Sequence, residues 1–224
     1  MEILPGIHLA DKGYSNVYLL VRKNKLILID TGMDKSAKKI ISYIQNLGYK
    51  PSDISHILLT HTHMDHIRGL RKIKELCNAK VAVHKEEADM VSGRKKLLLP
   101  KGFLGFFFRI MMPFMGYKPV NPEIILKDGD TIEGLKVIRT PGHTLGSICF
   151  HDKKNKVLFS GDLLSIDKGK LTYPKSNFNM DEDMLKSSVE KISKMSFNYM
   201  LPGHGIVIGP RAPEKLEQFL KKNI

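Results

Sequence analysis

His61-Thr62-His63-Met64-Asp65-His66 brings three imidazoles and one carboxylate together directly after the apolar run 54–59. Side chains two positions apart on an extended segment point to the same side, so His61 and His63 can hold one metal ion. Asp65 and His66 follow where the chain is expected to turn into a helix, and they can face a second metal. Burying such a cluster without a metal would be costly. The segment therefore predicts a metal site, and its ligand types suit zinc, while iron, manganese and cobalt also accept them.

The surrounding pattern predicts a chain of mixed α/β type. Apolar runs at 17–21 and 26–29 flank a polar turn and indicate a hairpin, and apolar residues at helical spacing predict a helix over 36–47. Further strands are predicted over 54–59, 80–83, 135–139, 147–151, 157–160 and 199–201, and further helices over 66–76, 86–91, 181–193 and 213–222. Two sheets packed face to face, with helices on both outer faces, would satisfy this order.

Length and composition favour one folded domain over residues 1–224. Hydrophobic residues make up 42% of the chain, which is enough for a substantial core. The formal net charge of +13 favours anionic partners such as nucleic acid, an anionic membrane face or an acidic small molecule. The lysines are spread along the chain, however, and no nucleic-acid-binding motif is present, so nucleic acid is not the favoured partner.

The cysteines and the N-terminal residues indicate a cytoplasmic protein. Cys77 and Cys149 lie in apolar stretches without metal-knuckle spacing, and we expect buried free thiols in a reducing compartment. Residues 1–6 lack the basic and apolar regions of a signal peptide. No uncharged apolar run approaches the roughly 20 residues of a membrane span, so no span is expected.

An apolar insertion around 95–120 stands apart from this pattern. Its core, residues 97–116, is rich in leucine, phenylalanine and methionine and is interrupted by Pro100, Lys101, Arg109 and Pro113. The simplest expectation is one or two helices buried against the body of the protein. The alternatives are a lid over the active site, an apolar substrate pocket, a homodimer contact or an interfacial membrane patch.

The histidine cluster resembles the His-x-His-x-Asp-His motif of the metallo-β-lactamase superfamily. The other motifs of that family follow its order. Asp30 lies in Leu28-Ile29-Asp30-Thr31-Gly32, His143 in Thr140-Pro141-Gly142-His143-Thr144, Asp162 in Phe159-Ser160-Gly161-Asp162, and His204 in Pro202-Gly203-His204-Gly205. The resemblance spans residues 30–204 and is specific for the superfamily rather than for a substrate.

The resemblance implies a four-layer αββα sandwich and a site with two divalent metals, zinc before iron or manganese. By position, His61, His63 and His143 would bind the first metal, Asp65, His66 and His204 the second, and Asp162 would bridge both. Two residues would have further catalytic roles: Asp65 would pass a proton to the leaving group, and Asp30 would orient the ligands. The glycine before each of His143, Asp162 and His204 is consistent with loops that approach a crowded site closely.

The implied reaction is hydrolysis, because two metals can activate a shared water as hydroxide. The absence of a Gly-x-Ser-x-Gly motif argues against a serine hydrolase. The chain is similar to the glyoxalase II-like and lactonase-like members, so an ester, a lactone or a thioester is the expected substrate. About 20 residues follow His204, too few for the glutathione-binding part of glyoxalase II, and Ser165 replaces the tyrosine of quorum-quenching lactonases. Antibiotic-cleaving members usually carry cysteine at the position of Asp162, so antibiotic cleavage is not expected.

Three alternatives stay open at this point. A phosphodiesterase or nuclease of the same superfamily would suit the positive charge, a mononuclear iron persulfide dioxygenase resembles the same motifs, and a non-catalytic binding module is the third. An apolar acyl group is expected near residues 103–115, and the candidate substrate contacts are Phe107, Tyr117, Tyr173 and Lys175. His84 ends a predicted strand and is assigned a structural role ahead of a place in the site.

Overall fold

The computed structural model describes residues 1–167 and 169–223, without the side chains of Leu104, Met112 and Pro113. Within it the chain forms two compact units, Met1–Ile125 and Leu126–Ile224. Each unit contains a β-sheet and helices that pack on it, so the mixed α/β class is confirmed. That both units belong to a single domain stays a prediction.

The first unit is built on a seven-stranded sheet whose strands follow the order of the chain. The strands are β1 (Glu2–Leu4), β2 (Ile7–Lys12), β3 (Asn16–Arg22), β4 (Lys25–Ile29), β5 (Ile54–Leu58), β6 (Lys80–His84) and β7 (Ile124–Leu126). Strands β1 to β4 pair antiparallel, which confirms the predicted hairpin, whereas β4, β5 and β6 pair parallel. The buried apolar run of β4, residues 26–29, is typical of a strand in a parallel sheet.

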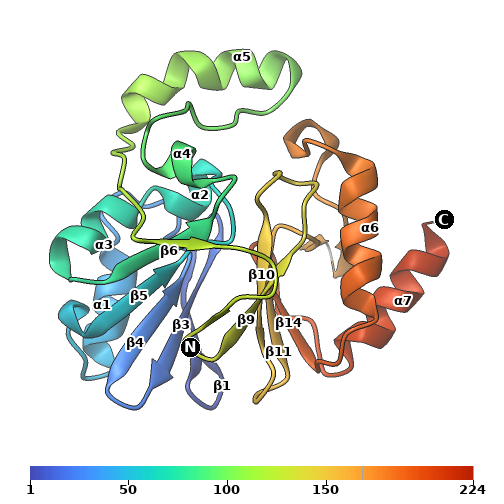
Figure 1. Cartoon of the computed structure of the whole chain (residues 1–224), viewed down its shortest axis with the longest axis horizontal. Coiled ribbons are helices and arrows are strands. Elements are labelled where there is room, and N and C mark those ends of the chain that lie inside the picture. The colour runs from blue at the N-terminus through green and yellow to red at the C-terminus, as the bar shows by residue number, and fades with distance from the viewer. Residues whose placement is uncertain (168, 224) are drawn as a thin grey trace. The chain divides into compact units, whose positions relative to one another are not determined.

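Helices α1 (Lys38–Asn46) and α3 (Leu70–Leu76) cover one face of this sheet (Figure 1). Ile40, Ile44 and Ile73 from these helices belong to the same buried cluster as Leu28 and Ile57 of the strands. Burial of these side chains stabilises the unit by roughly 1.5–3 kcal/mol for each one fully removed from water. The short 3₁₀ helix η1 (Pro51–Asp53) leads into β5.

The prediction of one continuous helix over 66–76 is wrong. The chain instead forms α2 (Met64–Ile67) and then α3, with a break at Arg68-Gly69. The backbone turns away from helical pairing because Thr31 N and Thr31 Oγ1 donate to His66 O at 2.7 Å and 2.9 Å. Gly69 also lies so close to this turn that an added Cβ would be 2.4 Å from Thr31 O.

The second unit contains a five-stranded sheet in the order β14-β11-β10-β9-β8. Its strands are β8 (Thr131–Ile132), β9 (Leu135–Arg139), β10 (Ile148–Asp152), β11 (Val157–Gly161) and β14 (Tyr199–Pro202), and only the β11–β14 pair is parallel. A separate ribbon pairs β12 (Ser165–Asp167) with β13 (Lys170–Thr172), and η3 (Ser176–Phe178) follows it.

Helices α6 (Glu182–Ser193) and α7 (Ala212–Lys222) pack on this second sheet (Figure 1). Leu185, Val189 and Leu216 from the helices share a buried cluster with Leu158 and Met200 of the strands. The predicted cap of α6 is confirmed, because Met184 N donates to Asp181 Oδ1 at 2.8 Å.

Strand direction explains where the motif residues collect in each unit. In the first unit, β4 and β5 run parallel, so Asp30 and His61, which follow their ends, emerge at the same sheet edge. In the second unit, β9, β11 and β14 share one direction, and the loops that follow them carry His143, Asp162 and His204. Parallel pairing thus gathers residues that are distant in the sequence.

The short helix α4 (Ala88–Val91) precedes the apolar insertion, which forms an extended stretch, α5 (Gly102–Met111) and η2 (Met112–Met115). Helix α5 lies outside α4, away from the sheet of its unit (Figure 1). The expectation of burial is wrong for this segment, because Phe103, Phe106, Phe107 and Phe114 are exposed. Within the described part of the chain, none of the helices has the length and apolar composition needed to cross a bilayer.

Candidate metal centre

In the first unit, four candidate ligands lie between the end of β5 and the end of α2. The donor atoms of His61 and His63 lie within 4.8 Å of each other, as do those of His61 and His66 and those of Asp65 and His66. The ring centroids of His61 and His66 are 4.1 Å apart, and both side chains are buried. The sequence cluster is therefore also a cluster of donor atoms in space.

Asp30 organises two of these imidazoles through one hydrogen-bond network. Its Oδ2 accepts from His66 Nδ1 at 2.8 Å and from Thr60 Oγ1 at 2.7 Å, and its Oδ1 accepts from Thr60 N at 2.8 Å. Thr60 Oγ1 lies 3.1 Å from His61 Nδ1 and, with its proton given to Asp30, accepts there. Both histidines are thereby protonated on Nδ1, which leaves each Nε2 with a lone pair for a metal.

The local backbone supports this role for Asp30. Its φ is +58°, in the left-handed region that aspartate tolerates better than most residues. This conformation occurs where the chain leaves β4, and Asp30 N donates to Leu58 O at 2.9 Å on the neighbouring strand. The carboxylate is buried, so its three hydrogen bonds replace the water that it lost on folding.

In the second unit, Asp162 lies between two histidines. Its Oδ2 is 3.4 Å from His143 Nε2 and 3.1 Å from His204 Nε2. Asp162 follows β11 and His204 follows β14, so the parallel pairing of these strands accounts for their proximity. One carboxylate oxygen close to two imidazole nitrogens is a suitable donor arrangement for divalent metals.

His143 is oriented by Asn179, a residue that precedes α6. Asn179 Nδ2 donates to Pro174 O at 3.0 Å, which directs Oδ1 towards His143 Nδ1 at 2.9 Å. His143 therefore carries its proton on Nδ1 and presents Nε2 to Asp162. The preceding Gly142 has φ +134° and lies against Leu185, where an added Cβ would be 2.2 Å from the backbone nitrogen. Glycine is thus required for the loop to approach α6.

The donor groups of both units fit divalent metals of the zinc, iron and manganese type. They are imidazole nitrogens and carboxylate oxygens. The three buried histidines among the candidate ligands, His61, His66 and His143, each have an Nδ1 partner that directs Nε2 outward. Such outer partners orient metal ligands in known sites. The donor types accommodate zinc, iron and manganese alike.

Sequence reasoning missed Thr60, Asn179 and Glu87. Glu87 is fully buried and accepts a short hydrogen bond from Thr62 Oγ1, within the histidine motif itself. Thr60 is adjacent to the motif and could have been considered as a partner of Asp30. Asn179 and Glu87 lie far from the motifs in the sequence, and no local pattern marks either of them.

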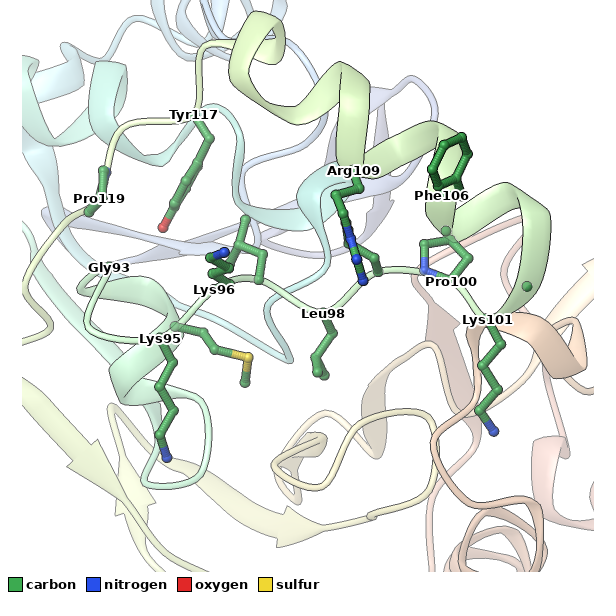
Figure 2. A pocket seen from close by; sticks show the side chains of 15 residues that line it. Gly93, Lys95, Lys96, Leu98, Pro100, Lys101, Phe106, Arg109, Tyr117 and Pro119 are labelled. Carbon is green, nitrogen blue, oxygen red and sulfur yellow. The ribbon is translucent and has the colours of Figure 1, made fainter.

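The first unit also contains a cavity of about 1060 Å³ beside α5. Its apolar lining includes Met90, Leu97, Leu98, Phe106 and Tyr117, and its basic lining comprises Lys95, Lys96, Lys101 and Arg109. Figure 2 shows Arg109 reaching from α5 towards the extended segment that carries Leu98 and Pro100. Gly105 lets α5 lie against this segment, since a Cβ there would overlap Pro100 O.

The cavity is connected to the histidine motif within the same unit. Met90 lines the cavity, and its Sδ lies 3.7 Å from Thr62 Oγ1. Arg68, two positions after His66, donates from Nε to Met115 O at 2.8 Å, so the segment that follows α5 is attached to the segment that follows α2. A ligand in the cavity would lie next to residues that contact the metal motif.

The predicted substrate contacts have different surroundings. Tyr117 lines the cavity; burial raises the pKa of its hydroxyl, which stays protonated and donates to Val91 O at 3.0 Å. Phe106 rather than Phe107 is part of the cavity lining, and Phe107 is exposed.

Tyr173 packs against Phe219 with ring centroids 4.9 Å apart, and Lys175 is exposed at the start of η3. His84 is buried, and its Nδ1 accepts from Glu86 N at 3.3 Å.

These sheets and ligand groups define a metallo-hydrolase fold. Residues 10–204 match the sequence profile of the metallo-beta-lactamase superfamily, and the chain belongs to this superfamily, which binds divalent metals. The fold class implied by the resemblance is therefore confirmed.

Individual relatives cover most of the chain. The uncharacterised protein YobT of Bacillus subtilis is 31% identical, over 92% of this chain and 89% of its own length. The human acyl-coenzyme A thioesterase MBLAC2 is 29% identical, over 85% of this chain and 72% of its own length. Among solved structures, the metallo-beta-lactamase family protein TTHA1429 of Thermus thermophilus superimposes with a TM-score of 0.75 at 23% identity, over 99% of this chain and 80% of its own.

Proposed function

We propose that this protein is a metal-dependent hydrolase of acyl thioesters, with related esters and lactones as further substrates. The observation that carries the substrate class is the cavity beside α5, in which apolar and basic side chains are combined. Its volume of about 1060 Å³ is at the upper end of the range of ligand sites, which is large enough for a long acyl chain. The basic side chains suit a thioester whose thiol part carries phosphate groups.

The proposed ligand sets follow the family motifs. His61, His63 and His143 hold one metal, Asp65, His66 and His204 hold the other, and Asp162 bridges the pair. The clustering of donors within each unit supports this assignment. Zinc is the first candidate; iron and manganese are compatible with the same donors.

The chain's own residues prepare the site for hydrolysis. Asp30 and Asn179 hold protons on the Nδ1 atoms of His66 and His143, so their Nε2 atoms are preorganised as donors. Two divalent metals bound there would polarise the scissile carbonyl and supply a nucleophilic water at neutral pH. Asp65, whose side chain retains partial exposure, is proposed to pass a proton to the departing thiol.

The relatives support the thioester assignment. MBLAC2 proteins of human, cattle and chicken, all named acyl-coenzyme A thioesterases, are 28–29% identical to this chain. An acyl-coenzyme A combines an apolar chain with phosphates, and the cavity lining offers partners for both parts. Leu97, Leu98 and Phe106 would contact the acyl chain, while Lys101 and Arg109 would contact phosphate.

A substrate panel tests the proposal. Protein loaded separately with zinc, iron or manganese is assayed on acyl-coenzyme A thioesters of increasing chain length, a lactone, a bis-aryl phosphate and RNA. We expect thioester hydrolysis that improves with chain length. Cleavage of the phosphodiesters without any action on thioesters or lactones would reject the proposal, and oxygen uptake with a persulfide would instead identify a dioxygenase.

Arg109→Gln tests the role of the cavity in substrate binding. Loss of one charge-assisted contact to phosphate should raise KM for acyl-coenzyme A about tenfold, with little change for a neutral thioester. Lys186→Gln, on α6, is the matched control because it removes an exposed positive charge outside the cavity. If both variants changed KM equally, the cavity would not be the site that binds the phosphates.

A further inference from the structure

Helix α5 and η2 expose several large apolar side chains. Phe103, Phe106, Phe107 and Ile110 are spaced at i, i+3, i+4 and i+7, which places them on one face of α5. Phe114, in the following η2, is a further exposed apolar residue of this segment. Phe103 is 85% exposed and Phe114 is 79% exposed, values far from those of core residues. We call these five residues the α5 stripe. Contiguous exposed apolar side chains of this kind mark a surface for interaction.

The stripe belongs to a strongly basic segment. Between Asp89 and Glu123 the sequence contains no acidic residue and six basic ones: Arg94, Lys95, Lys96, Lys101, Arg109 and Lys118. All six are exposed. Asp89, at the edge of the segment, pairs with Arg94 at 2.8 Å and with Lys95 at 3.4 Å and offsets part of this charge. The segment therefore combines an apolar stripe with an excess of positive charge.

The stripe and the cavity lie on different faces of α5. Gly102, Gly105 and Arg109 line the cavity, and only Phe106 belongs to both surfaces. The extreme exposure of Phe103 and Phe114 is consequently not explained by the proposed acyl site. A partner other than the substrate would remove these side chains from water.

We propose that the α5 stripe docks on the surface of a bilayer that contains anionic phospholipids. Clusters of four to eight basic residues on an amphipathic helix are typical of binding to anionic lipid. Here Arg109 lies on α5, and the other five basic residues flank the helix in the sequence. Helix α5 has 10 residues, about half the number needed to span a bilayer, so it would lie in the interface with its phenylalanines among the acyl chains. The surrounding lysines and arginines would contact the phosphates.

Charge favours this partner over a second copy of the chain. A symmetric dimer through the stripe would bring the same six basic residues of both copies together. An anionic lipid surface instead provides the opposite charge next to an apolar interior. The inference does not depend on the proposed thioesterase activity, because the five residues of the α5 stripe lie outside the metal motifs and, Phe106 apart, outside the cavity. Four of the six basic residues, Lys95, Lys96, Lys101 and Arg109, also line the cavity.

Vesicle co-sedimentation tests the inference on the full-length protein. Vesicles of phosphatidylcholine alone are compared with vesicles that also contain phosphatidylglycerol. We expect binding to the anionic vesicles, weakened when NaCl is raised from about 0.1 M to about 1 M, as the Debye length falls from about 10 Å to about 3 Å. Absence of binding to anionic vesicles at the lower salt concentration would overturn the proposal.

Two pairs of variants locate the surface. Phe103→Glu with Phe114→Glu should weaken binding tenfold or more, since burial of a phenylalanine contributes roughly 1.5–3 kcal/mol. The control, Ile125→Glu with Met184→Glu, adds the same charge at exposed apolar positions outside the stripe and should bind like the wild type. Lys118→Gln should weaken binding roughly fivefold, whereas Lys194→Gln should not. Circular dichroism checks that each variant is folded.

Other partners give distinct results. Sedimentation velocity that shows a wild-type dimer, dissociated by the two Phe→Glu substitutions, would assign the stripe to a second copy and overturn the proposal. A wild type that does not bind vesicles but binds single-stranded RNA, with RNA binding abolished by these substitutions, would assign the stripe to nucleic acid. That result would also overturn the proposal. Equal vesicle binding by the stripe variant and its control would also reject the α5 stripe as the docking surface.

Discussion

At the scale of single residues, Asp30 determines the tautomer of two candidate ligands. Its carboxylate accepts directly from His66 and through Thr60 Oγ1 is linked to His61. A carboxylate can only accept, so the direction of every hydrogen bond in this chain of contacts is set. The motif match identified Asp30, whereas the link through Thr60 became evident only from atomic positions.

Asp30→Asn should destabilise the protein even without metal. Asparagine tolerates the left-handed backbone at this position, but its amide group would place a donor against donors from Thr60 or His66. We expect the free energy of unfolding in urea, with chelator present, to fall by about 1.5–3 kcal/mol. Asp130→Asn is the control, because Asp130 is exposed and caps a turn by accepting from Lys127 N. An equal loss in both variants would contradict a special role for Asp30.

At the scale of secondary-structure elements, close approaches of backbone segments position the ligands. The loop before β10 rests on α6 at Gly142, and Gly142 O accepts from Met180 N and Asp181 N, both at 2.9 Å. His143 follows Gly142 directly and its partner Asn179 precedes Met180 directly, so this contact brings the two side chains together. The order of strands brings the loop to the correct sheet edge, and the contact with α6 sets the imidazole orientation.

Gly142→Ala should therefore be far more damaging than another glycine substitution in the same unit. The new Cβ would overlap the backbone of Leu185, and the φ of +134° is unfavourable for alanine. Gly129 also has a positive φ, +87°, but an added Cβ there meets nothing within 4 Å. We expect a loss of about 1–2 kcal/mol for Gly129→Ala from backbone strain alone. Thermal unfolding should show a clearly larger loss for Gly142→Ala, and comparable losses would disprove the packing argument.

The carboxylate of Glu123 stabilises the edge of the first sheet, and this contribution to stability should be lost in acid. Burial acts to raise the pKa of Glu123, but hydrogen bonds from Lys74 Nζ and Val81 N outweigh it, and the pKa is lowered. A lowered folded-state pKa contributes stability above the unfolded-state value of about 4.5, and this contribution is lost as the pH falls through the folded-state pKa.

Glu123→Gln should accordingly lower stability at pH 7 and matter less in acid. Because the side chain is partly exposed, we expect a loss of only about 0.5–1 kcal/mol at pH 7. Urea unfolding of wild type and variant should converge below about pH 4.5, within the range where both remain folded. If the difference in unfolding free energy between wild type and variant stayed constant with pH, ionisation of Glu123 would be excluded as its cause. Lys74→Gln should reproduce the loss at pH 7.

At the scale of the whole molecule, the proposed ligands come from both compact units. His61, His63, Asp65 and His66 precede the boundary at Ile125, whereas His143, Asp162 and His204 follow it. Metal that binds only the folded protein stabilises it by a free energy that grows with the logarithm of the ratio of free metal concentration to Kd. Removal of metal should therefore reduce the stability of both units, and hydrogen exchange should detect the change on either side of the boundary.

Metal analysis of two variants tests the assignment of these ligands. Asp162→Ala should reduce both metals, because the proposed bridging carboxylate serves each of them, while His204→Ala should mainly reduce the second. The measurement is the number of metals per chain after purification without added metal. Loss of a single metal to the same extent in both variants would contradict a bridging role for Asp162.

Sequence by itself determined the superfamily, the seven candidate ligands and most of the regular elements. Motif residues and apolar periodicity are local properties, so they can be recognised without knowledge of long-range contacts. The helix break at Gly69 and the strands β1, β2, β7, β8, β12 and β13 escaped prediction, because they depend on contacts with other segments.

Only the tertiary structure decided how the candidate ligands are oriented and which side chains of the apolar insertion are exposed. Asn179 lies 36 residues from His143 in the sequence, and only the folding of the chain brings the two together. Likewise, the phenylalanines of residues 103–114 carry the same apolar signal whether buried or exposed, and tertiary packing places most of them in solvent. The histidine motif predicts a metal site from local sequence alone. Contacts between distant segments determine the tautomers of the histidines, the shape of the cavity and the exposure of the phenylalanines next to the cavity.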